Sequence, residues 1–254
     1  MKKKYLAIAA MLIPAWMYAQ NPGPQLYNMS FDEWSKKRGA WNLYPVNPSE
    51  TERIWDSANH GLCLLGKNGA EPETEIVAVK GPGKKAARLH SEKVLWAFAA
   101  GNIYTGSFVR IINFSGAEIT LGTPFNARPV SLSGYYYYIP KEVNYARPPY
   151  DYMKGKMDIG QIDVILTDWD EPFHVITNSK QFVDSAADPH IIGTGNLLLR
   201  EETDGYVHFE LKINYRDSRI PKLAVITVAS SRYGDYFTGG DGSTLYVDEF
   251  QFNY

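Results

Sequence analysis

The sequence predicts an all-β protein, built as a β-sandwich, from three observations. Short segments with apolar residues at every second position recur along the chain, as expected of strands with one buried face. Turn signals rich in glycine and proline, such as Gly81–Gly83 and Gly239–Gly242, separate them. Helical periodicity is almost absent. Many short strands with this punctuation favour a sandwich or a barrel.

The first nineteen residues are predicted to be a secretory signal peptide. Lys2–Lys4 form a positive start, Tyr5–Trp16 form an apolar stretch, and Met17–Ala19 end in a small residue suited to cleavage. The apolar stretch is shorter than the roughly 20 residues that a membrane-spanning helix needs. No cysteine follows the cleavage point, so we expect a periplasmic or secreted protein without a lipid anchor or a transmembrane helix.

The mature chain is expected to start with an extended lead-in, residues 20–27, followed by one domain over residues 28–254. No linker of changed composition interrupts it. The whole chain has 26 basic and 28 acidic residues. Without the three lysines of the signal, 26 − 3 = 23 basic residues face 28 acidic ones, a net charge of −5. This balance argues against nucleic acid or an anionic membrane as partner. The lone Cys63, in an apolar run, is interpreted as a buried small hydrophobe.

The clearest strand is Tyr206–Tyr215, in which Val207 and Phe209 begin a regular alternation of apolar and polar residues. Lys222–Ala229 is apolar on both faces, which predicts a central strand of a sheet. The other predicted strands are Thr74–Lys80, Ala86–Ser91, Ile103–Ile112, Ala117–Leu121, Ser131–Pro140, Gly160–Thr167, Phe173–Thr177, Asn196–Glu201 and Ser243–Tyr254.

Two local features interrupt this pattern. Ser30–Glu33 has the composition of a capping box, which predicts a short helix through Lys37. In the last strand Leu245 and Phe250 both need the core although an odd number of steps separates them. A β-bulge near Asp248-Glu249 would reset the alternation.

The closing segment Ala229–Phe250 resembles the C-terminal signature of the putative carbohydrate metabolism (PCMD) domain family. Earlier segments agree with that resemblance: Phe31–Trp34, Trp55–Asn59, Ala86–Leu89, Asn102–Gly106 and Arg128–Tyr138. The resemblance covers about residues 28–254. It implies a jelly-roll β-sandwich, similar to carbohydrate-binding modules and galactose-binding-like domains, in exported bacterial proteins that take part in glycan utilisation.

The resemblance also implies one structural calcium ion. In similar jelly rolls an acidic residue near the first strand and an Asp in the last strand often hold it. The matching positions are Asp32 and Asp248, with Glu33 and Glu249 as near alternatives. Calcium needs six to eight oxygen ligands, so backbone carbonyls and water would complete the shell. The alternative is that Asp32 caps a helix and Asp248 bonds to a turn.

Aromatic residues beside polar ones predict a carbohydrate-binding face. The chain has 6 Trp, 18 Tyr and 11 Phe, and sugar rings stack on such side chains while polar groups bind their hydroxyls. Any one of these aromatics could instead pack in the core, but so many cannot all be buried. The predicted ligand-binding residues are Trp55, Asn59, Arg88, Tyr104, Tyr136, Tyr138, Arg232 and Tyr236.

Catalytic patterns are weak. The acids of Asp168–Glu171 are neighbours on one connection, whereas a glycosidase needs two carboxyls about 5–10 Å apart across the scissile bond. No histidine spacing of a metal site and no nucleophile elbow is present. We therefore expect a non-catalytic protein that binds an oligo- or polysaccharide. The alternatives are a glycoside hydrolase or polysaccharide lyase, and an adhesion or structural module that binds an outer-surface protein.

Overall fold

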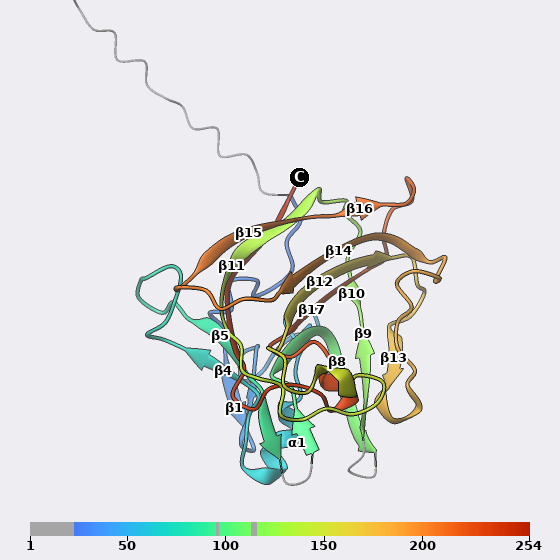
Figure 1. The fold of residues 1–254 in the computed structure, drawn as a ribbon. Coiled ribbons are helices and arrows are strands. Elements are labelled where there is room, and N and C mark those ends of the chain that lie inside the picture. Colours follow the sequence, from blue (N-terminus) through green and yellow to red (C-terminus); the bar gives the residue numbers. More distant parts are fainter. Residues whose placement is uncertain (1–22, 95–96, 113–115) are drawn as a thin grey trace, which may run out of the picture.

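The structure, a computed structural model, describes residues 23–94, 97–112 and 116–254. The predicted signal peptide and the start of the lead-in lie outside these residues. The fold is a jelly-roll β-sandwich of two antiparallel sheets that lie face to face (Figure 1). Within the described ranges, no helix is long and apolar enough to cross a membrane.

The larger sheet has nine strands. In spatial order they are β13 (Phe173–Ile176), β9 (Gly116–Leu121), β8 (Asn102–Ile112), β17 (Leu223–Ala229), β12 (Gly160–Thr167), β14 (Ile191–Leu199) and β16 (Asn214–Tyr215), with β10 (Thr123–Pro124) on β17 and β3 (Trp55–Asp56) on β8. The predicted central strand is confirmed, because β17 lies between β8 and β12.

The smaller sheet has five strands, in the order β15 (Val207–Lys212), β11 (Ser131–Ile139), β18 (Thr244–Asn253), β5 (Ala86–His90) and β4 (Ala70–Glu73). Two hairpins flank the sandwich, β1 (Ser35–Lys37) with β2 (Ala40–Asn42) and β6 (Glu92–Val94) with β7 (Ala97–Ala99). The helical elements are short: α1 (Asn59–Leu62) and the 3₁₀ turns η1 (Cys63–Leu65), η2 (Asp151–Met153), η3 (Thr177–Ser179) and η4 (Gly234–Tyr236).

The core lies between the two sheets. Ile162, Val164 and Leu166 of β12 point into it, while the residues between them face the other way. From the smaller sheet, Leu245 and Phe252 of β18 pack against the same cluster. Alternation along each strand thus fixes which face of each sheet is left for solvent or ligand.

The predicted bulge in the last strand is confirmed. Ser133 pairs with Gln251 and Tyr135 with Asp248, so the single residue Gly134 lies opposite two residues of β18. The extra residue returns Phe250 to the core, as the sequence required.

Two predicted elements are wrong. The short helix over residues 30–37 is a turn followed by β1, because the side chain of Asn28 accepts the N–H of Glu33 at 2.9 Å and Phe31 has φ of +57°. The predicted strand Thr74–Lys80 is a loop after β4. There the Glu73 carboxylate accepts backbone N–H groups that a strand would have paired, including that of Glu75 at 2.8 Å.

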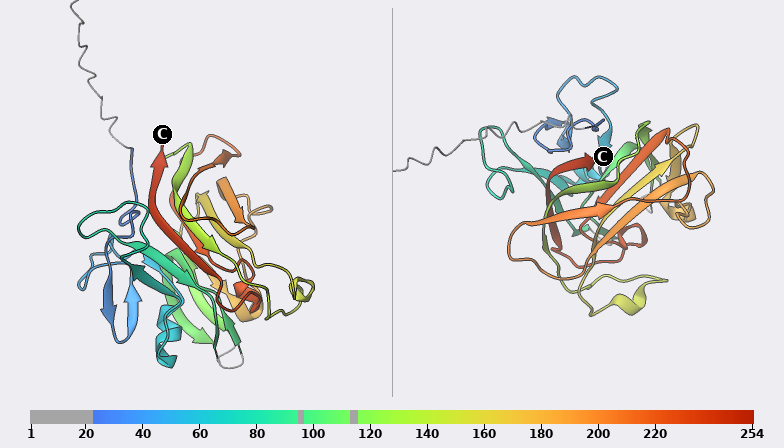
Figure 2. Two further views of the ribbon diagram at one scale, coloured as in Figure 1. Left: turned by 60° about the vertical axis from the view of Figure 1, so that its left-hand side comes forward. Right: turned by 90° about the horizontal axis from the view of Figure 1, so that it is seen from above.

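Two predicted strands have different bounds. β14 begins at Ile191, five residues before the predicted start, and ends at Leu199. The segment Tyr206–Tyr215 breaks at Ile213, whose N–H donates to the carbonyl of Val130 at 2.9 Å. β15 therefore belongs to one sheet and β16 to the other, and the chain turns a corner along the top of the sandwich (Figures 1 and 2).

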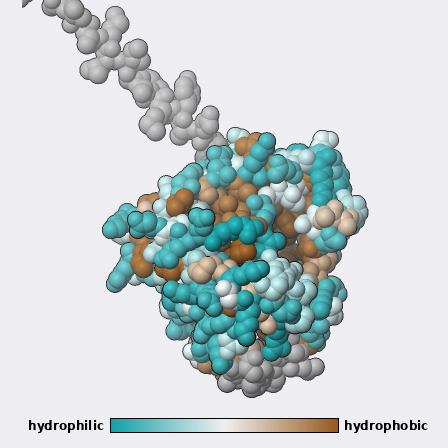
Figure 3. Space-filling model, in the orientation of Figure 1, coloured by the Kyte–Doolittle hydropathy of each residue, from teal (hydrophilic) through white to brown (hydrophobic). Residues whose placement is uncertain are grey.

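The surface in the orientation of Figure 1 is mostly hydrophilic, with hydrophobic side chains gathered toward its middle (Figure 3). Cys63 is half-buried in η1, so it is less enclosed than the sequence suggested.

Candidate functional site

A cleft of about 580 Å³ lies on the outer face of the nine-stranded sheet, the face turned away from the core. Strands β8, β17, β12 and β14 form its floor. Loops that follow β11, β13 and β17 form its walls, through Tyr150, the segment around Phe182, and η4.

Cross-strand pairing places the floor residues in rows. Tyr104 of β8 pairs with Thr227 of β17, Thr227 pairs with Asp163 of β12, and Asp163 pairs with Asn196 of β14. All four side chains line the cleft. The row is possible because each of these residues occupies an outward position next to inward apolar residues of the same strand.

A second row runs beside the first. Asn102 of β8 pairs with Ala229, which pairs with Gln161 of β12. Amide and hydroxyl groups on two adjacent rows, spaced by the strand separation of about 5 Å, offer donors and acceptors in a regular array. Such an array suits a ligand with many hydroxyl groups.

Asp163 is the acidic centre of the floor. Its carboxylate accepts hydrogen bonds from the Asn196 amide and, at 3.5 Å, from the Thr227 hydroxyl. Partial burial raises its pKa above the usual value, although the hydrogen bond from Asn196 and the positive charge of Arg232 act in the opposite direction.

Asp235 of η4 is the second carboxyl of the cleft. Asp235 is an exposed residue, so water reaches its carboxyl, and among the described contacts it accepts no hydrogen bond and forms no ion pair. The Tyr104 hydroxyl, in contrast, is buried without a hydrogen-bond partner among the described residues, and burial raises its pKa.

An aromatic wall borders the polar floor. The rings of Tyr150 and Tyr233 stack with centroids 4.0 Å apart, and Tyr236 meets Tyr150 edge-on at 4.9 Å. Phe182, from the loop after β13, packs against Tyr236 at 5.3 Å. The wall therefore combines segments that are 32 and 54 residues distant from Phe182 in the sequence, and mutual packing holds the rings rigidly.

Three of the eight predicted binding residues come together at this cleft: Tyr104, Arg232 and Tyr236. Arg232 follows β17, and its guanidinium lies 5.7 Å from the ring centroid of Tyr233. Their roles in binding stay predictions.

The other five do not reach the cleft. Trp55, Asn59 and Tyr138 lie in the interior, and Tyr136 is partly buried against the core. Arg88 lies on the outer face of the smaller sheet, paired with Glu71. Asn59 is fully enclosed because its amide donates to the carbonyls of Trp41 and Ala70. Tyr138 is enclosed because its hydroxyl donates to the carbonyl of Ser230 at 2.9 Å.

Sequence reasoning missed most of the floor. Gln161, Asp163 and Asn196 were not singled out, although Gln161 and Asp163 alternate with core residues of a correctly predicted strand. The available signal was the alternation along this strand: the residues between the inward apolar positions are polar, so they must lie on the outer face of the sheet. The sequence could not show that β12 lies there.

The carboxylates of the predicted calcium site have protein partners in this structure, although Asp248 Oδ1 is buried without one among the described residues. Asp32 accepts a hydrogen bond from the ammonium of Lys84 at 3.0 Å, and the same ammonium binds the carboxylate of Glu249. Lys84 therefore pairs with one predicted ligand, Asp32, and with the near alternative Glu249. Asp248 instead accepts the N–H of Ala78 at 2.8 Å. The described residues contain no group of three or more His, Cys, Asp or Glu arranged to hold a metal.

The comparisons with known proteins agree with this fold. Residues 30–253 match the putative carbohydrate metabolism domain, so the chain belongs to that family. No curated protein matches the sequence.

Two solved structures are similar over most of the chain. One is described as a putative glycoside hydrolase from Bacteroides thetaiotaomicron, with 20% identity, a TM-score of 0.66, and coverage of 89% of this chain and 70% of that one. The other is described as a putative glycoside hydrolase from Bacteroides vulgatus, with 19% identity, a TM-score of 0.63, and coverage of 87% and 94%. At these identities the likeness shows the shared fold.

Proposed function

We propose that the protein binds an oligo- or polysaccharide chain in the cleft of the nine-stranded sheet. The observation that carries this proposal is the combination of a polar floor with a packed aromatic wall. Pyranose rings have apolar C–H faces that stack on aromatic rings and hydroxyl edges that need hydrogen bonds. A chain lying along the rows would place its rings against Tyr236 and its hydroxyls against Gln161, Asp163 and Asn196.

Family membership supports the same proposal, since the family's description concerns carbohydrate metabolism. With the predicted signal peptide, this suggests a secreted or periplasmic protein that captures glycans outside the cytoplasm. The mature net charge of −5 also suits a neutral sugar better than a polyanionic one.

Affinity electrophoresis and calorimetry against a polysaccharide panel test the proposal. Arg232→Ala should weaken binding of the best ligand about 10-fold or more, because a hydrogen bond to a charged group contributes about 1.5–3 kcal/mol. Arg88→Ala is the matched control, since it removes an arginine from the opposite sheet. Absence of binding to the whole panel, or equal loss in both variants, would contradict the proposal.

Hydrolysis of the bound glycan is the second candidate function. Asp163 and Asp235 both line the cleft, and burial raises the pKa of Asp163, as a general acid requires. The two similar solved structures, described as putative glycoside hydrolases, point the same way.

Product release from the panel distinguishes hydrolysis from binding alone. If the protein is an enzyme, Asp163→Asn or Asp235→Asn should lower its rate at least about 100-fold, a larger effect than the loss of about 10-fold in glycan affinity expected for Asp163→Asn. If no product forms over a long incubation, the non-catalytic function stands.

A further inference from the structure

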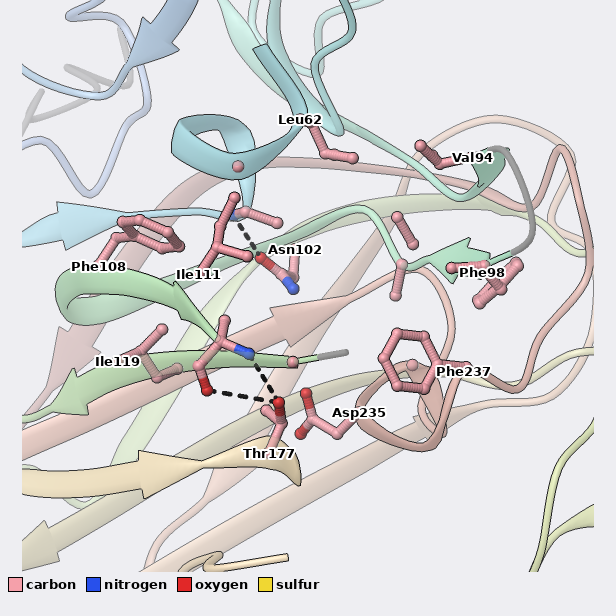
Figure 4. Close-up of a pocket in the computed structure, with 18 of the residues that line it drawn as sticks. Leu62, Val94, Phe98, Asn102, Phe108, Ile111, Ile119, Thr177, Asp235 and Phe237 are labelled. Atoms are coloured by element: carbon pink, nitrogen blue, oxygen red, sulfur yellow. Dashed lines mark hydrogen bonds between the residues drawn. The ribbon is translucent and has the colours of Figure 1, made fainter. Parts of the chain in front are cut away.

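A second cavity adjoins the cleft, and its lining differs in kind. It has a volume of about 250 Å³ and lies between α1, the β6–β7 hairpin, β8, β9 and η4 (Figure 4). Its walls are largely apolar, and Figure 4 shows the side chains that converge on it: Leu62, Val94, Phe98, Phe108, Ile111 and Phe237.

The apolar lining continues to the surface. Leu64 and Leu65 of η1 also line the cavity, and 70% and 46% of their surface is exposed. Exposed leucines next to an apolar cavity form a continuous apolar path from solvent to its interior, of the kind that marks ligand sites.

The two cavities meet at a polar junction. Asn102, Tyr104 and Asp235 line both of them. The oxygen of Asn102 accepts the N–H of Ala58 at 3.1 Å, while its amide nitrogen points into the cavity (Figure 4).

The junction has hydrogen-bonding groups without protein partners. Tyr104 is 96% buried, since its exposed fraction is 4%, and its hydroxyl has no partner. The Asp235 carboxyl also has none among the described contacts. A buried hydroxyl without a partner is destabilising, so natural structures usually satisfy such groups with protein, water or ligand. A bound linking oxygen at the junction would accept a hydrogen bond from the Tyr104 hydroxyl, which has no partner among the described residues.

We propose that this cavity binds the apolar, non-sugar part of a glycoside whose sugar lies in the cleft, with the linking oxygen at the Asn102–Tyr104–Asp235 junction. The proposal rests on the proposed carbohydrate binding and specifies its ligand class as alkyl or aryl glycosides. Size agrees: an apolar cavity of about 150 Å³ holds benzene, so one of 250 Å³ holds a substituted ring or a short alkyl chain.

Calorimetry with matched pairs of methyl and hexyl glycosides of glucose, galactose, mannose, xylose and arabinose tests the proposal. For at least one sugar the hexyl glycoside should bind at least about 10-fold more tightly than its methyl partner, because each buried methylene adds to the affinity. The polysaccharide panel serves in parallel as the measure of carbohydrate binding.

Two variants test which residues are responsible for the tighter binding of hexyl glycosides. Ala117→Phe, on β9, fills the apolar cavity and should remove the preference for hexyl while leaving methyl-glycoside affinity unchanged within about 2-fold. Tyr104→Phe removes the junction hydroxyl and should weaken both members of a pair several-fold. Its thermal stability should not fall, because that hydroxyl has no protein partner to lose.

The outcomes separate this proposal from the proposed function. If polysaccharides bind but hexyl and methyl glycosides bind equally, only the apolar-cavity proposal is overturned. If 1-hexanol alone binds as tightly as the hexyl glycosides, the cavity takes apolar molecules without the sugar, and the glycoside assignment is wrong. If nothing in either series binds, both proposals are overturned.

Discussion

The outer faces of both sheets carry tyrosine and charged side chains, but the two faces differ in how far these side chains have partners within the protein. On the five-stranded sheet, Tyr137 of β11 pairs with Tyr246 of β18, and Tyr246 pairs with Arg88 of β5. The two tyrosine rings stack at 5.4 Å, and the Arg88 guanidinium lies 3.4 Å from the carboxylate of Glu71 on β4. Each group in this row has a neighbour in the protein.

The loop over residues 74–85 also reaches over the five-stranded sheet. The hydroxyl of Tyr206 donates to the carbonyl of Ile76 at 2.9 Å, and Asp248 accepts the N–H of Ala78. Lys84, near the end of that loop, bridges Asp32 and Glu249. Most aromatic and charged groups of this face therefore hold the fold together, while Asp248 Oδ1 is buried without a hydrogen-bond partner among the described residues.

The nine-stranded sheet leaves comparable groups open. The Tyr104 hydroxyl is buried without a hydrogen-bond partner among the described residues, the Asp235 carboxyl is exposed, and both residues line cavities. An aromatic or acidic residue is thus informative about function only when its neighbours leave it unpaired. Four predictions, from the largest expected effect to the smallest, test this contrast.

Asp248→Asn should stabilise the protein at neutral pH by about 2 kcal/mol. Burial raises the pKa of Asp248 to about 6, so the folded protein holds this proton where the unfolded chain, with a pKa near 4, has lost it. Stability from this group is therefore present below about pH 4 and lost as the pH rises through about 6. The gain should vanish near pH 4 in urea unfolding, and Asp204→Asn, at an exposed turn, should show none. A destabilised Asp248→Asn at pH 7 would contradict this.

Lys84→Met should destabilise the protein by about 1–2 kcal/mol at pH 7. It removes the ammonium between Asp32 and Glu249, and breaking a partly buried ion pair costs less than breaking a fully buried one. Burial acts to raise the pKa of Asp32, but its hydrogen bonds with Lys85 and Lys84 hold that pKa below the usual value. The effect should therefore shrink as the pH falls below about 4.

The control for Lys84→Met is Lys222→Met. Lys222 pairs with Asp170, but that pair is exposed, so its loss should change the free energy of unfolding by less than about 0.5 kcal/mol. Equal effects of the two substitutions would show that the five-stranded face is not held by its ion pairs.

Asp163→Asn should have opposite effects on stability and on binding. Removing a half-buried carboxylate with a raised pKa should stabilise the protein by up to about 1 kcal/mol, after allowance for solvent screening. The same change should weaken glycan binding about 10-fold, because an acceptor of the floor becomes a donor. Thermal unfolding and calorimetry on one preparation measure both. A substitution that lowers stability and leaves binding intact would assign Asp163 to the fold.

Calcium and EDTA should shift the melting temperature by less than about 1 °C. The ammonium of Lys84 already forms ion pairs with both Asp32 and Glu249, so these carboxylates gain less from a metal. A ligand that binds only the folded state would raise the melting temperature with its concentration. A rise of several degrees with calcium, reversed by EDTA, would restore the site that the resemblance implies.

Local pattern was sufficient for most of the sandwich. The bounds of β12 agree with the prediction at both ends, and the bulge opposite Gly134 follows from the need of Phe250 for the core. The prediction failed where a side chain accepts backbone N–H groups that a helix or strand would have used. The carboxylate of Glu73 and the amide of Asn28 take the N–H groups of nearby residues, and no periodicity reveals such bonds in advance.

The candidate site was only partly predictable. Aromatic residues beside polar ones predicted Arg232 and Tyr236, which line the cleft, and equally Trp55 and Asn59, which are fully enclosed. A Trp ring packs in a core as readily as it stacks on a sugar, so the presence of a Trp in the sequence does not show which of the two it does.

The sequence by itself determined the fold class, the family and the strands whose inward faces are apolar. The tertiary structure decided which outward residues share a row. Asp163 and Asn196 are 33 residues apart, and Tyr104 and Thr227 are 123 apart, yet strand pairing makes them neighbours on one floor. The physical reason is that alternation along a strand is a local property, whereas strand order and the burial of one hydroxyl depend on contacts between distant segments.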